Sequence, residues 1–522
     1  MISKFFTTEK HPYDEVEWVK KDAFIVSSSG EKIFYQAGVE FPAYWSQNSI
    51  NIVSSKYFKT KGGQKEYSLK QLIDRVVKNI AKFGLEKEYF GGDEEAKTFE
   101  LELTYILLHQ VACFNSPVLF NLGVENKPSC SACYILELND TMPSILDWYR
   151  EEGTIFKGGS GSGINLSSLR SSFEGVGEDG KSSGPLAFAR VADTLAGAIK
   201  SGGKSRRSAK LISLDISHPD ILEFIHCKAK EEKIIGALKE AGLNLSLDSP
   251  YQHNIQYQNG NNSVRVTDEF MQKAIEGKEW QTKLVVRGEP HRTYNAKELL
   301  SEIAKAAWEC GDPAVQFHDT INKWNTCLNG GEIVASNACS EFNFLSNSAC
   351  NLASINLLKF LNPDNTLDAK AFLHVVDVLI VAQDIIVDLS SYPTEKITKR
   401  SHDYRPLGLG YSNLGSLLMC MGYPYDSEGG RDTAKWITSL MTAQAYLTSS
   451  KIAEKLGAFT YFENNQAHML AVIKTHIEAL EHMPLSITPY TLWRQVFEAF
   501  LKYGFRNAQV TCLAPCGTIS FF

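Results

Sequence analysis

Hydrophobic positions in the first part of the chain follow a helical period. In residues 68–84 apolar residues recur at helical spacing, and Ser68 and Gln71 form a capping pair that predicts a helix start, with Gly84 as its stop. Residues 94–114 show the same spacing and predict a second helix. The pattern therefore predicts a mainly helical N-terminal domain.

From about residue 126 the pattern changes to short alternating stretches followed by amphipathic ones. Strands are predicted in ACYILEL, KLISLDIS, LNLSLD and the first part of SVRVTDEFMQKAI, and helices in HPDILEFIHCK and the second part of SVRVTDEFMQKAI. Repeated strand–helix units favour an α/β architecture in which short loops carry the site. We therefore predict a helical domain over residues 1–125 and an α/β domain over residues 126–522.

Two more helices and an unusual ending complete the pattern. Residues 371–389 are rich in apolar residues but interrupted by polar ones, which predicts a buried helix, and residues 432–456 predict another that Gly457 closes. The final stretch LAPCGTISFF combines a turn with the beginning of a strand. Because a strand needs neighbours, we expect the chain to be a fragment.

The composition argues against several classes of protein. The 522 residues are 43% hydrophobic and 22% charged, as in ordinary globular proteins, and the net charge of −7 argues against a nucleic-acid partner. Eleven cysteines without regular spacing do not form a disulfide framework. We find no signal-peptide pattern and no apolar run long enough to span a membrane. The expected location is the cytoplasm, where thiols are reduced.

The first candidate for chemistry is the polar stretch SNACSEFNFLSNSACNL. Asn337, Cys339 and Glu341 are spaced i, i+2 and i+4, so on an extended segment their side chains share one face. An amide, a thiol and a carboxylate would then meet, which suits a cysteine that works beside a base. The alternative is a loop with a buried structural cysteine.

A second candidate is the C-x-x-C formed by Cys130 and Cys133. Zinc would need further ligands, and the chain has neither a second such pair nor an H-E-x-x-H motif. A thioredoxin-like redox pair is another interpretation. In a third, only one of the two cysteines matters and pairs with a distant one such as Cys350. The spacing leaves all three open.

Three further stretches favour contact with a ligand. Residues 157–172 match neither a Walker nor a G-x-G-x-x-G motif, but their small residues permit a close backbone approach to a ligand. Residues 199–210 predict a flexible basic loop suited to phosphates, with a solvated basic turn as the alternative. The basic residues of this loop are Lys200, Lys204, Arg206, Arg207 and Lys210. The turn PCGT offers backbone N–H groups to an anion.

These pieces together resemble the catalytic subunit of class II, adenosylcobalamin-dependent ribonucleotide reductase over nearly the whole chain. The segments that carry the resemblance include FNSPVLFNLG, SACYIL, GTIFKGGSGSGINLSSLRSS, IKSGGKSRRSAK, SNACSEFNFLSNSACNLASINLLKFL and LAPCGTISFF. The resemblance implies a ten-stranded α/β barrel of the ribonucleotide reductase and glycyl radical type behind a helical N-terminal domain. The last strands of that barrel would be missing from this chain.

The resemblance also implies a role for each candidate residue. Cys339 would lie on a loop inside the barrel and become a thiyl radical that abstracts the 3′-hydrogen of a ribonucleotide, by resemblance a diphosphate. Glu341 would take the 3′-hydroxyl proton while the 2′-hydroxyl leaves as water, and Asn337 would orient the substrate. Cys133 and Cys350 would supply the reducing equivalents and end as a disulfide, which leaves Cys130 incidental.

Substrate, effector and partner contacts follow from the same resemblance. The substrate contacts would be Ser116, Ala132, Cys133, Gly161, Asn337, Ala338, Cys339, Ser340, Glu341, Pro515, Cys516, Gly517, Thr518 and Ile519. The contacts to a deoxynucleotide or ATP effector would be Asp140, Arg170, Lys204, Arg206 and Arg207. The expected cofactor is adenosylcobalamin, with no metal ligated by side chains, and the expected partners are a thioredoxin-like reductant and a second copy of the chain.

One departure and two alternatives accompany this interpretation. The family's phosphate turn usually reads P-T-G-T, and Cys516 replaces the first threonine, which removes a hydroxyl from that turn. The first alternative is a class I catalytic subunit that receives its radical from a metal-containing partner. The second is a noncatalytic nucleotide-binding remnant.

Overall fold

The computed structural model describes residues 2–27, 30–61, 63–199, 208–243, 255–482 and 487–522. The chain divides into two units: residues 1–132 together with 350–522 form unit 1, and residues 133–349 form unit 2. Unit 2 is therefore inserted between the two parts of unit 1. The domain boundary predicted at residue 125 stays a prediction.

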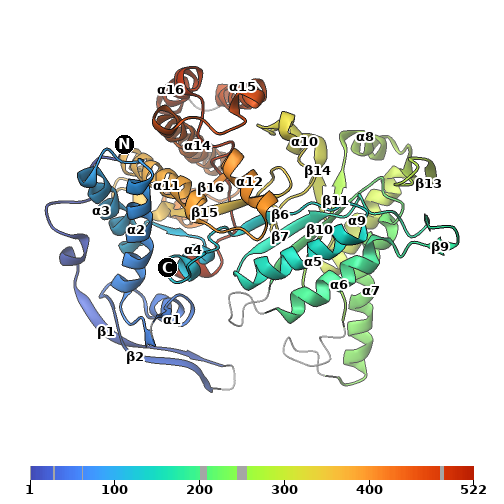
Figure 1. Ribbon diagram of the computed structural model, residues 1–522, viewed down its shortest axis with the longest axis horizontal. Coiled ribbons are helices and arrows are strands. Elements are labelled where there is room, and N and C mark those ends of the chain that lie inside the picture. The colour runs from blue at the N-terminus through green and yellow to red at the C-terminus, as the bar shows by residue number, and fades with distance from the viewer. Residues whose placement is uncertain (1, 28–29, 62, 200–207, 244–254, 483–486) are drawn as a thin grey trace. The chain divides into compact units, whose positions relative to one another are not determined.

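Unit 2 contains a parallel sheet whose strands run in the order β6–β7–β10–β11–β14. Helices α5, α6 and α7 pack beside this sheet (Figure 1). The strands are β6 (Cys133–Ile135), β7 (Gly161–Asn165), β10 (Ala209–Asp215), β11 (Asn261–Val266) and β14 (Ala314–Phe317). The helices are α5 (Met142–Lys157), α6 (Gly184–Ala198), α7 (Ile221–Glu240), α8 (Asp268–Glu276), α9 (Ala296–Cys310) and α10 (His318–Lys323). The hairpins are β8 (Gly175–Val176) with β9 (Gly180–Lys181), and β12 (Glu279–Lys283) with β13 (Pro290–Asn295).

The strand–helix alternation predicted for this part of the chain is confirmed wherever the structure describes it. Strand β10 carries a nearly continuous run of buried residues, as expected for a parallel strand covered on both faces. The LNLSLD stretch lies almost wholly in residues 244–254, outside the described residues. Lys210 was predicted in a flexible basic loop, and this is wrong, because it is buried on β10 and pairs with Glu152 of α5 at 2.8 Å.

The first part of unit 1 is helical, with one long hairpin. Strands β1 (Trp18–Val26) and β2 (Lys32–Pro42) pair antiparallel, a feature that the prediction of a mainly helical N-terminal domain missed. The helices are α1 (Gln47–Lys56), α2 (Leu69–Glu86), α3 (Asp93–Leu108) and α4 (Ser116–Asn121), and the short strands are β3 (Thr60–Lys61), β4 (Gln64–Lys65) and β5 (Ala112–Phe114).

The predicted start of α2 is correct, but two predicted helix ends are wrong. Ser68 and Gln71 form the expected capping box. Gly84 lies inside α2 and does not end it; a Cβ there would lie 2.7 Å from Ile385 of α11, so glycine lets the two helices approach. Helix α3 ends at Leu108, and the segment that follows turns into β5.

The second part of unit 1 contributes a parallel strand pair and a helical layer. Strand β15 (Ser348–Asn356), of which residues 350–356 belong to this unit, pairs parallel with β16 (Leu407–Ser412) and antiparallel with β5. The helices are α11 (Ala369–Leu389), α12 (Glu395–Tyr404), α13 (Leu414–Cys420), α14 (Glu428–Leu456), α15 (Phe462–Glu478) and α16 (Ile487–Tyr503). The predicted helices over 371–389 and 432–456 are confirmed. The strand predicted in ISFF is wrong, because Thr518–Phe521 forms a short 3-10 helix.

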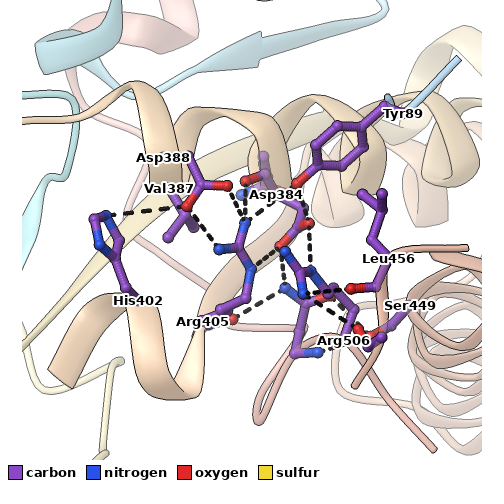
Figure 2. Close-up of polar contacts among 12 residues, drawn as sticks. Tyr89, Asp384, Val387, Asp388, His402, Arg405, Ser449, Leu456 and Arg506 are labelled. Carbon is purple, nitrogen blue, oxygen red and sulfur yellow. Dashed lines mark hydrogen bonds and ion pairs between the residues drawn. The ribbon is translucent and has the colours of Figure 1, made fainter. Parts of the chain in front are cut away.

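A buried cluster of charges ties these elements together (Figure 2). The Arg405 guanidinium donates to Asp384 at 2.8 Å and to Asp388 at 2.7 Å. The Tyr89 hydroxyl donates to Asp384 at 2.6 Å, and the amide of Asn507 donates to the same carboxylate at 2.7 Å. Burial alone would raise the pKa of Asp384, but the neighbouring arginine charges and these hydrogen bonds hold it below its ordinary value. The cluster therefore fixes α11 beside the segments that begin at Arg405 and Asn507.

Candidate active site

The polar stretch that begins at Ser336 forms a tight loop in unit 2. Ser336 and Asn343 face each other as an antiparallel bridge. Asn337 closes the loop twice, since its backbone N–H donates to the Phe342 carbonyl at 3.0 Å and its side-chain oxygen accepts from the Phe342 N–H at 3.0 Å. Ser340 adopts a left-handed conformation with φ of 67°. The expected extended segment is therefore wrong, because the chain reverses at the tip.

The loop nevertheless brings the predicted amide and carboxylate to one thiol. The Asn337 side-chain N–H donates to Cys133 Sγ at 2.9 Å, and the Cys133 thiol donates to Glu341 Oε1 at 3.5 Å. Asn337 and Cys133 are buried, whereas Cys339, near the tip, is exposed. The arrangement separates one accessible thiol from a buried amide and thiol that meet a half-buried carboxylate.

Glu341 keeps one carboxylate oxygen for a further partner. Its Oε2 atom is buried and accepts no hydrogen bond from the described part of the chain. A buried acceptor without a donor is costly, so such an atom suits a hydroxyl that arrives with a ligand. The resemblance implies a proton-accepting role for Glu341, and that role stays a prediction.

Two glycines of β7 leave room for the loop to pack closely against this strand. A Cβ on Gly161 would lie 3.0 Å from the Ala338 side chain, and a Cβ on Gly163 would lie 2.8 Å from the carbonyl carbon of Ser336 and closer still to its oxygen. The small residues predicted to admit a ligand thus admit the chain's own loop. Gly161 is also paired in register with Cys133 of β6, so the same strand positions the buried thiol.

A buried polar chain that the sequence analysis missed holds the base of the loop. Gln316 of β14 donates to Ser336 Oγ at 2.8 Å and to Ser340 Oγ at 2.7 Å. Arg265 of β11 in turn donates to the Gln316 side-chain oxygen at 2.8 Å, and burial lowers the pKa of Arg265. Each is a polar residue between two apolar neighbours, a pattern that marks a buried polar position but not its partner.

Cys130 has the properties of a structural cysteine. Its side chain is fully buried in unit 1, and burial raises the pKa of its thiol to about 12. A thiol that stays protonated is a poor nucleophile and a poor metal ligand. Among the described residues, no group of three or more histidine, cysteine, aspartate or glutamate side chains could hold a metal ion.

The predicted effector residues are only partly described. Arg170 Nε donates to Asp140 at 2.6 Å in unit 2, and its Nη1 donates to the Gly175 carbonyl at 3.2 Å. The two residues predicted to share a site are thus in contact. Lys204, Arg206 and Arg207 lie outside the described residues.

The remaining predicted substrate contacts belong to unit 1. Ser116 begins α4 and shares a hydrogen bond with the Tyr57 hydroxyl at 3.0 Å. The Ala132 N–H donates to the carbonyl of Cys350 at 3.0 Å, and Cys350 is fully buried. The turn at 515–519 lies at a small cavity of about 60 Å³ that Cys516 and Ile519 line. Their grouping with the loop of unit 2 stays a prediction.

Comparison with known proteins identifies the fold and then the family. Residues 131–522 match the family described as ribonucleotide reductase, barrel domain. The chain therefore belongs to the ribonucleotide reductase family, and the predicted α/β class is confirmed, while the number of ten strands stays a prediction. Residues 19–110 match the family described as class II vitamin B12-dependent ribonucleotide reductase.

Individual relatives support the same assignment. A vitamin B12-dependent ribonucleotide reductase of Streptomyces clavuligerus is 47% identical over 524 residues, which cover 98% of this chain and 54% of the relative. One of Rhodopirellula baltica is 43% identical over 560 residues, and a vitamin B12-dependent ribonucleoside-diphosphate reductase of Mycobacterium tuberculosis (strain H37Rv) is 30% identical over 497 residues. The alignment with the Rhodopirellula baltica protein covers 99% of this chain and 54% of that protein. The alignment with the mycobacterial protein covers 92% of this chain and 60% of that protein.

The chain spans about half the length of the curated relatives it matches most extensively. Within the described ranges, no helix combines the length and the apolar character needed to cross a bilayer.

Proposed function

We propose that this chain carries the catalytic core of a vitamin B12-dependent ribonucleotide reductase, which converts ribonucleotides to 2′-deoxyribonucleotides. The observation that supports this most directly is the loop of unit 2, on which an exposed Cys339 lies close in sequence to the buried contacts of Asn337 and Glu341 with Cys133. The relatives named vitamin B12-dependent ribonucleotide reductase add independent support.

In the proposed reaction each group on the loop has one task. The Cys339 thiyl takes the 3′-hydrogen of the ribose, and Glu341 accepts the proton of the 3′-hydroxyl through its unpartnered oxygen. The 2′-hydroxyl then leaves as water. Cys133 and Cys350 each give up a hydrogen and join as a disulfide, so the two electrons that reduce the ribose come from this pair. The Cys339 thiol finally returns its hydrogen atom to C3′, which restores the thiyl.

Asn337 is the residue proposed to orient the ribose. Its side-chain oxygen is held by the Phe342 N–H, which fixes the direction in which its N–H points toward Cys133. Such preorganisation stabilises a transition state without a rearrangement during the reaction.

The exposure of Cys339 fits a cofactor that must reach this thiol. Adenosylcobalamin, when bound, would supply the radical that removes the hydrogen atom from this thiol. The buried position of Asn337 and Cys133 would keep water and other hydrogen donors away from the reacting ribose.

Further parts of the proposal concern partners and location. We propose a deoxynucleotide or ATP effector at Asp140 and Arg170, a thioredoxin-like reductant for the disulfide, a homodimer and a cytoplasmic location. The diphosphate level of the substrate is suggested by the mycobacterial relative's name. The N-terminal match to the B12-dependent class favours this cofactor over the radical partner protein of class I.

The test is to incubate the purified chain with adenosylcobalamin, a dithiol and a ribonucleoside diphosphate, and to measure deoxynucleotide by chromatography. We expect product with the wild type and none with Cys339→Ser, whereas Cys420→Ser, which alters another exposed cysteine, should retain the wild-type rate. Nucleotide binding without product, together with indifference to Cys339→Ser, would instead identify a noncatalytic remnant.

A further inference from the structure

The arm that leads into the loop, residues 333–338, lies on the sheet of unit 2 in a fixed register. A Cβ on Gly163, in the middle of β7, would overlap the Ser336 carbonyl oxygen. The side chain of Asn165, the last residue of β7, donates to the Val334 carbonyl at 2.9 Å. A step of two residues forward along the strand thus meets a step of two residues back along the arm, so the arm runs antiparallel to β7.

Strand β11 holds the two ends of this arm. The side-chain N–H of Asn261, the first residue of β11, donates to the Ala338 carbonyl at 3.1 Å. Arg265, near the end of the same strand, donates through Nη2 to the Ile333 carbonyl at 2.7 Å. The place of the loop tip therefore depends on side chains that project from the strands on which the arm lies.

Arg265 is a buried cation without a carboxylate at ion-pair distance in the part of the chain that the structure describes. Only 2% of its surface is exposed. Besides the Ile333 carbonyl, its guanidinium donates to Gln316 Oε1 at 2.8 Å and to His318 Nδ1 at 3.1 Å, and both of these acceptors are uncharged. Its Nε has no acceptor among the described residues. Because an unpaired charge is costly to bury, the arrangement indicates a role other than stability.

The guanidinium fixes the direction of the Gln316 amide. Because a guanidinium only donates, it takes the amide oxygen, and the amide nitrogen faces the loop. This nitrogen donates to Ser336 Oγ at 2.8 Å and to Ser340 Oγ at 2.7 Å. Ser340, the residue after Cys339, has a φ of 67°, a left-handed conformation that a serine keeps only where its surroundings hold it. The bond from Gln316 is one of the contacts that hold it.

We propose that Arg265 is a positioning residue for Cys339 and acts through Gln316. This inference rests on the proposed function, in which the Cys339 thiyl takes the 3′-hydrogen of the ribose. The guanidinium orients the amide, the amide holds two hydroxyls of the loop, and the tip stays at the place from which the thiyl reaches the ribose. Release of the tip slows the transfer of the hydrogen atom and leaves nucleotide binding unchanged, because the thiyl acts only in the chemical step.

The competing interpretation is that Arg265 and Gln316 only stabilise the sheet. It predicts that the loss of activity follows the loss of folded protein, and that the two side chains act independently. Residues that act as one unit show effects that do not multiply when both are replaced. The two interpretations therefore differ in the double variant.

The first experiment is a double-variant cycle with Arg265→Met, Gln316→Met and both together in the full 522-residue chain. The values of kcat and KM for deoxynucleotide formation are measured with adenosylcobalamin and a dithiol. We expect kcat to fall on the order of 10- to 100-fold in each single variant with KM unchanged, and the double variant to be about as slow as the slower single variant. Two effects that multiply in the double variant would overturn the action of Arg265 through Gln316.

The second experiment observes the loop without the reaction. Hydrogen–deuterium exchange with mass spectrometry follows the backbone N–H groups of residues 337–342, which hydrogen bonds within the loop protect. We expect exchange on the order of 10-fold faster in Arg265→Met and in Gln316→Met. The matched control is Lys210→Met, which removes a buried cation of the neighbouring strand β10 and should leave the loop at the wild-type rate. Wild-type exchange in both loop variants would refute the proposal.

The remaining outcomes separate this proposal from the proposed function. If the wild type forms no deoxynucleotide, the proposed function fails, while the exchange experiment still decides whether Arg265 and Gln316 hold the tip. If the loop exchanges faster but kcat does not fall, Cys339 needs no such positioning and the proposal is overturned. If urea denaturation shows that Arg265→Met does not fold, Arg265→Lys takes its place, because lysine keeps the charge but lacks the planar fork of donors. Wild-type kcat and loop exchange in Arg265→Lys would then overturn the proposal.

Discussion

Gly163→Ala should displace the loop of residues 336–343, which carries Cys339, without a change of charge or polarity. The new methyl carbon would lie 2.8 Å from the Ser336 carbonyl carbon, where nonbonded carbons ordinarily stand about 3.5 Å or more apart, so loop and strand must separate by about 1 Å. Overpacking of this kind costs about 1–3 kcal/mol of stability, and a displacement of about 1 Å at a reacting group costs on the order of 100-fold in rate.

Three measurements test this displacement. The urea midpoint should fall, deoxynucleotide formation should drop by on the order of 100-fold, and alkylation of Cys133 should become faster, because Asn337 and Glu341 move away from its thiol. The matched control is Gly236→Ala on helix α7, where a Cβ would meet nothing within 4 Å and stability should stay equal or rise. If Gly163→Ala behaves like Gly236→Ala in all three measurements, the inference that Gly163 is needed for close packing of the loop is refuted.

Three other predictions concern buried charges and thiols. Asp384→Asn should lower the free energy of unfolding by about 3–5 kcal/mol in urea denaturation, because it removes the buried carboxylate that pairs with Arg405 and leaves this guanidinium with Asp388 alone, whereas the exposed Asp426→Asn should change it by less than about 0.5 kcal/mol. Equal effects would contradict the cluster's role. Burial raises the pKa of Glu102 on α3, but hydrogen bonds with His374 and Thr7 outweigh this and lower the pKa from 4.5 to about 2. The contribution of Glu102 to stability is therefore present above pH 4.5 and is lost as the pH falls toward 2. Thermal melts in this range should show less acid sensitivity in Glu102→Gln, and an unchanged pH profile would refute the assignment. At pH 8 iodoacetamide should modify Cys339 quickly and Cys130 hardly at all, because Cys339 is exposed and burial raises the pKa of the Cys130 thiol to about 12. Mass spectrometry measures the two rates of modification, and similar rates would contradict this prediction.

Local features of the fold could be predicted from the sequence, because neighbouring residues determine them. The capping pair of Ser68 and Gln71 and the helix end at Gly457 depend on contacts within a few residues, and both are confirmed. Gly84 was misjudged, because its partner Ile385 lies about 300 residues away and glycine serves packing there rather than helix termination. The same distance hid the burial of Lys210 against Glu152.

The site was predictable in its residue types but not in its shape. Asn337 and Glu341 do gather at one thiol, yet the thiol in contact is Cys133, and the alternation argument failed because Ser340 turns the chain into a left-handed conformation. A polar sequence of six residues does not reveal whether it is extended or folded back. The supporting residue Gln316 was missed because its role depends on a register between strands that only the folded sheet defines.

The insertion of unit 2 into unit 1 has a consequence for the order of events during synthesis. Unit 2 is continuous in sequence, so all of it has left the ribosome before the second part of unit 1 follows. The carboxylate of Asp384 acquires Asn507 only when roughly 120 more residues have been made, which takes on the order of 6–25 s at bacterial elongation rates. The first 132 residues wait longer for a partner, because α11, against which α2 and α3 pack, begins only at Ala369. We therefore expect a nascent chain to expose the apolar faces of α2 and α3 until the loop that carries Cys339 has already been made.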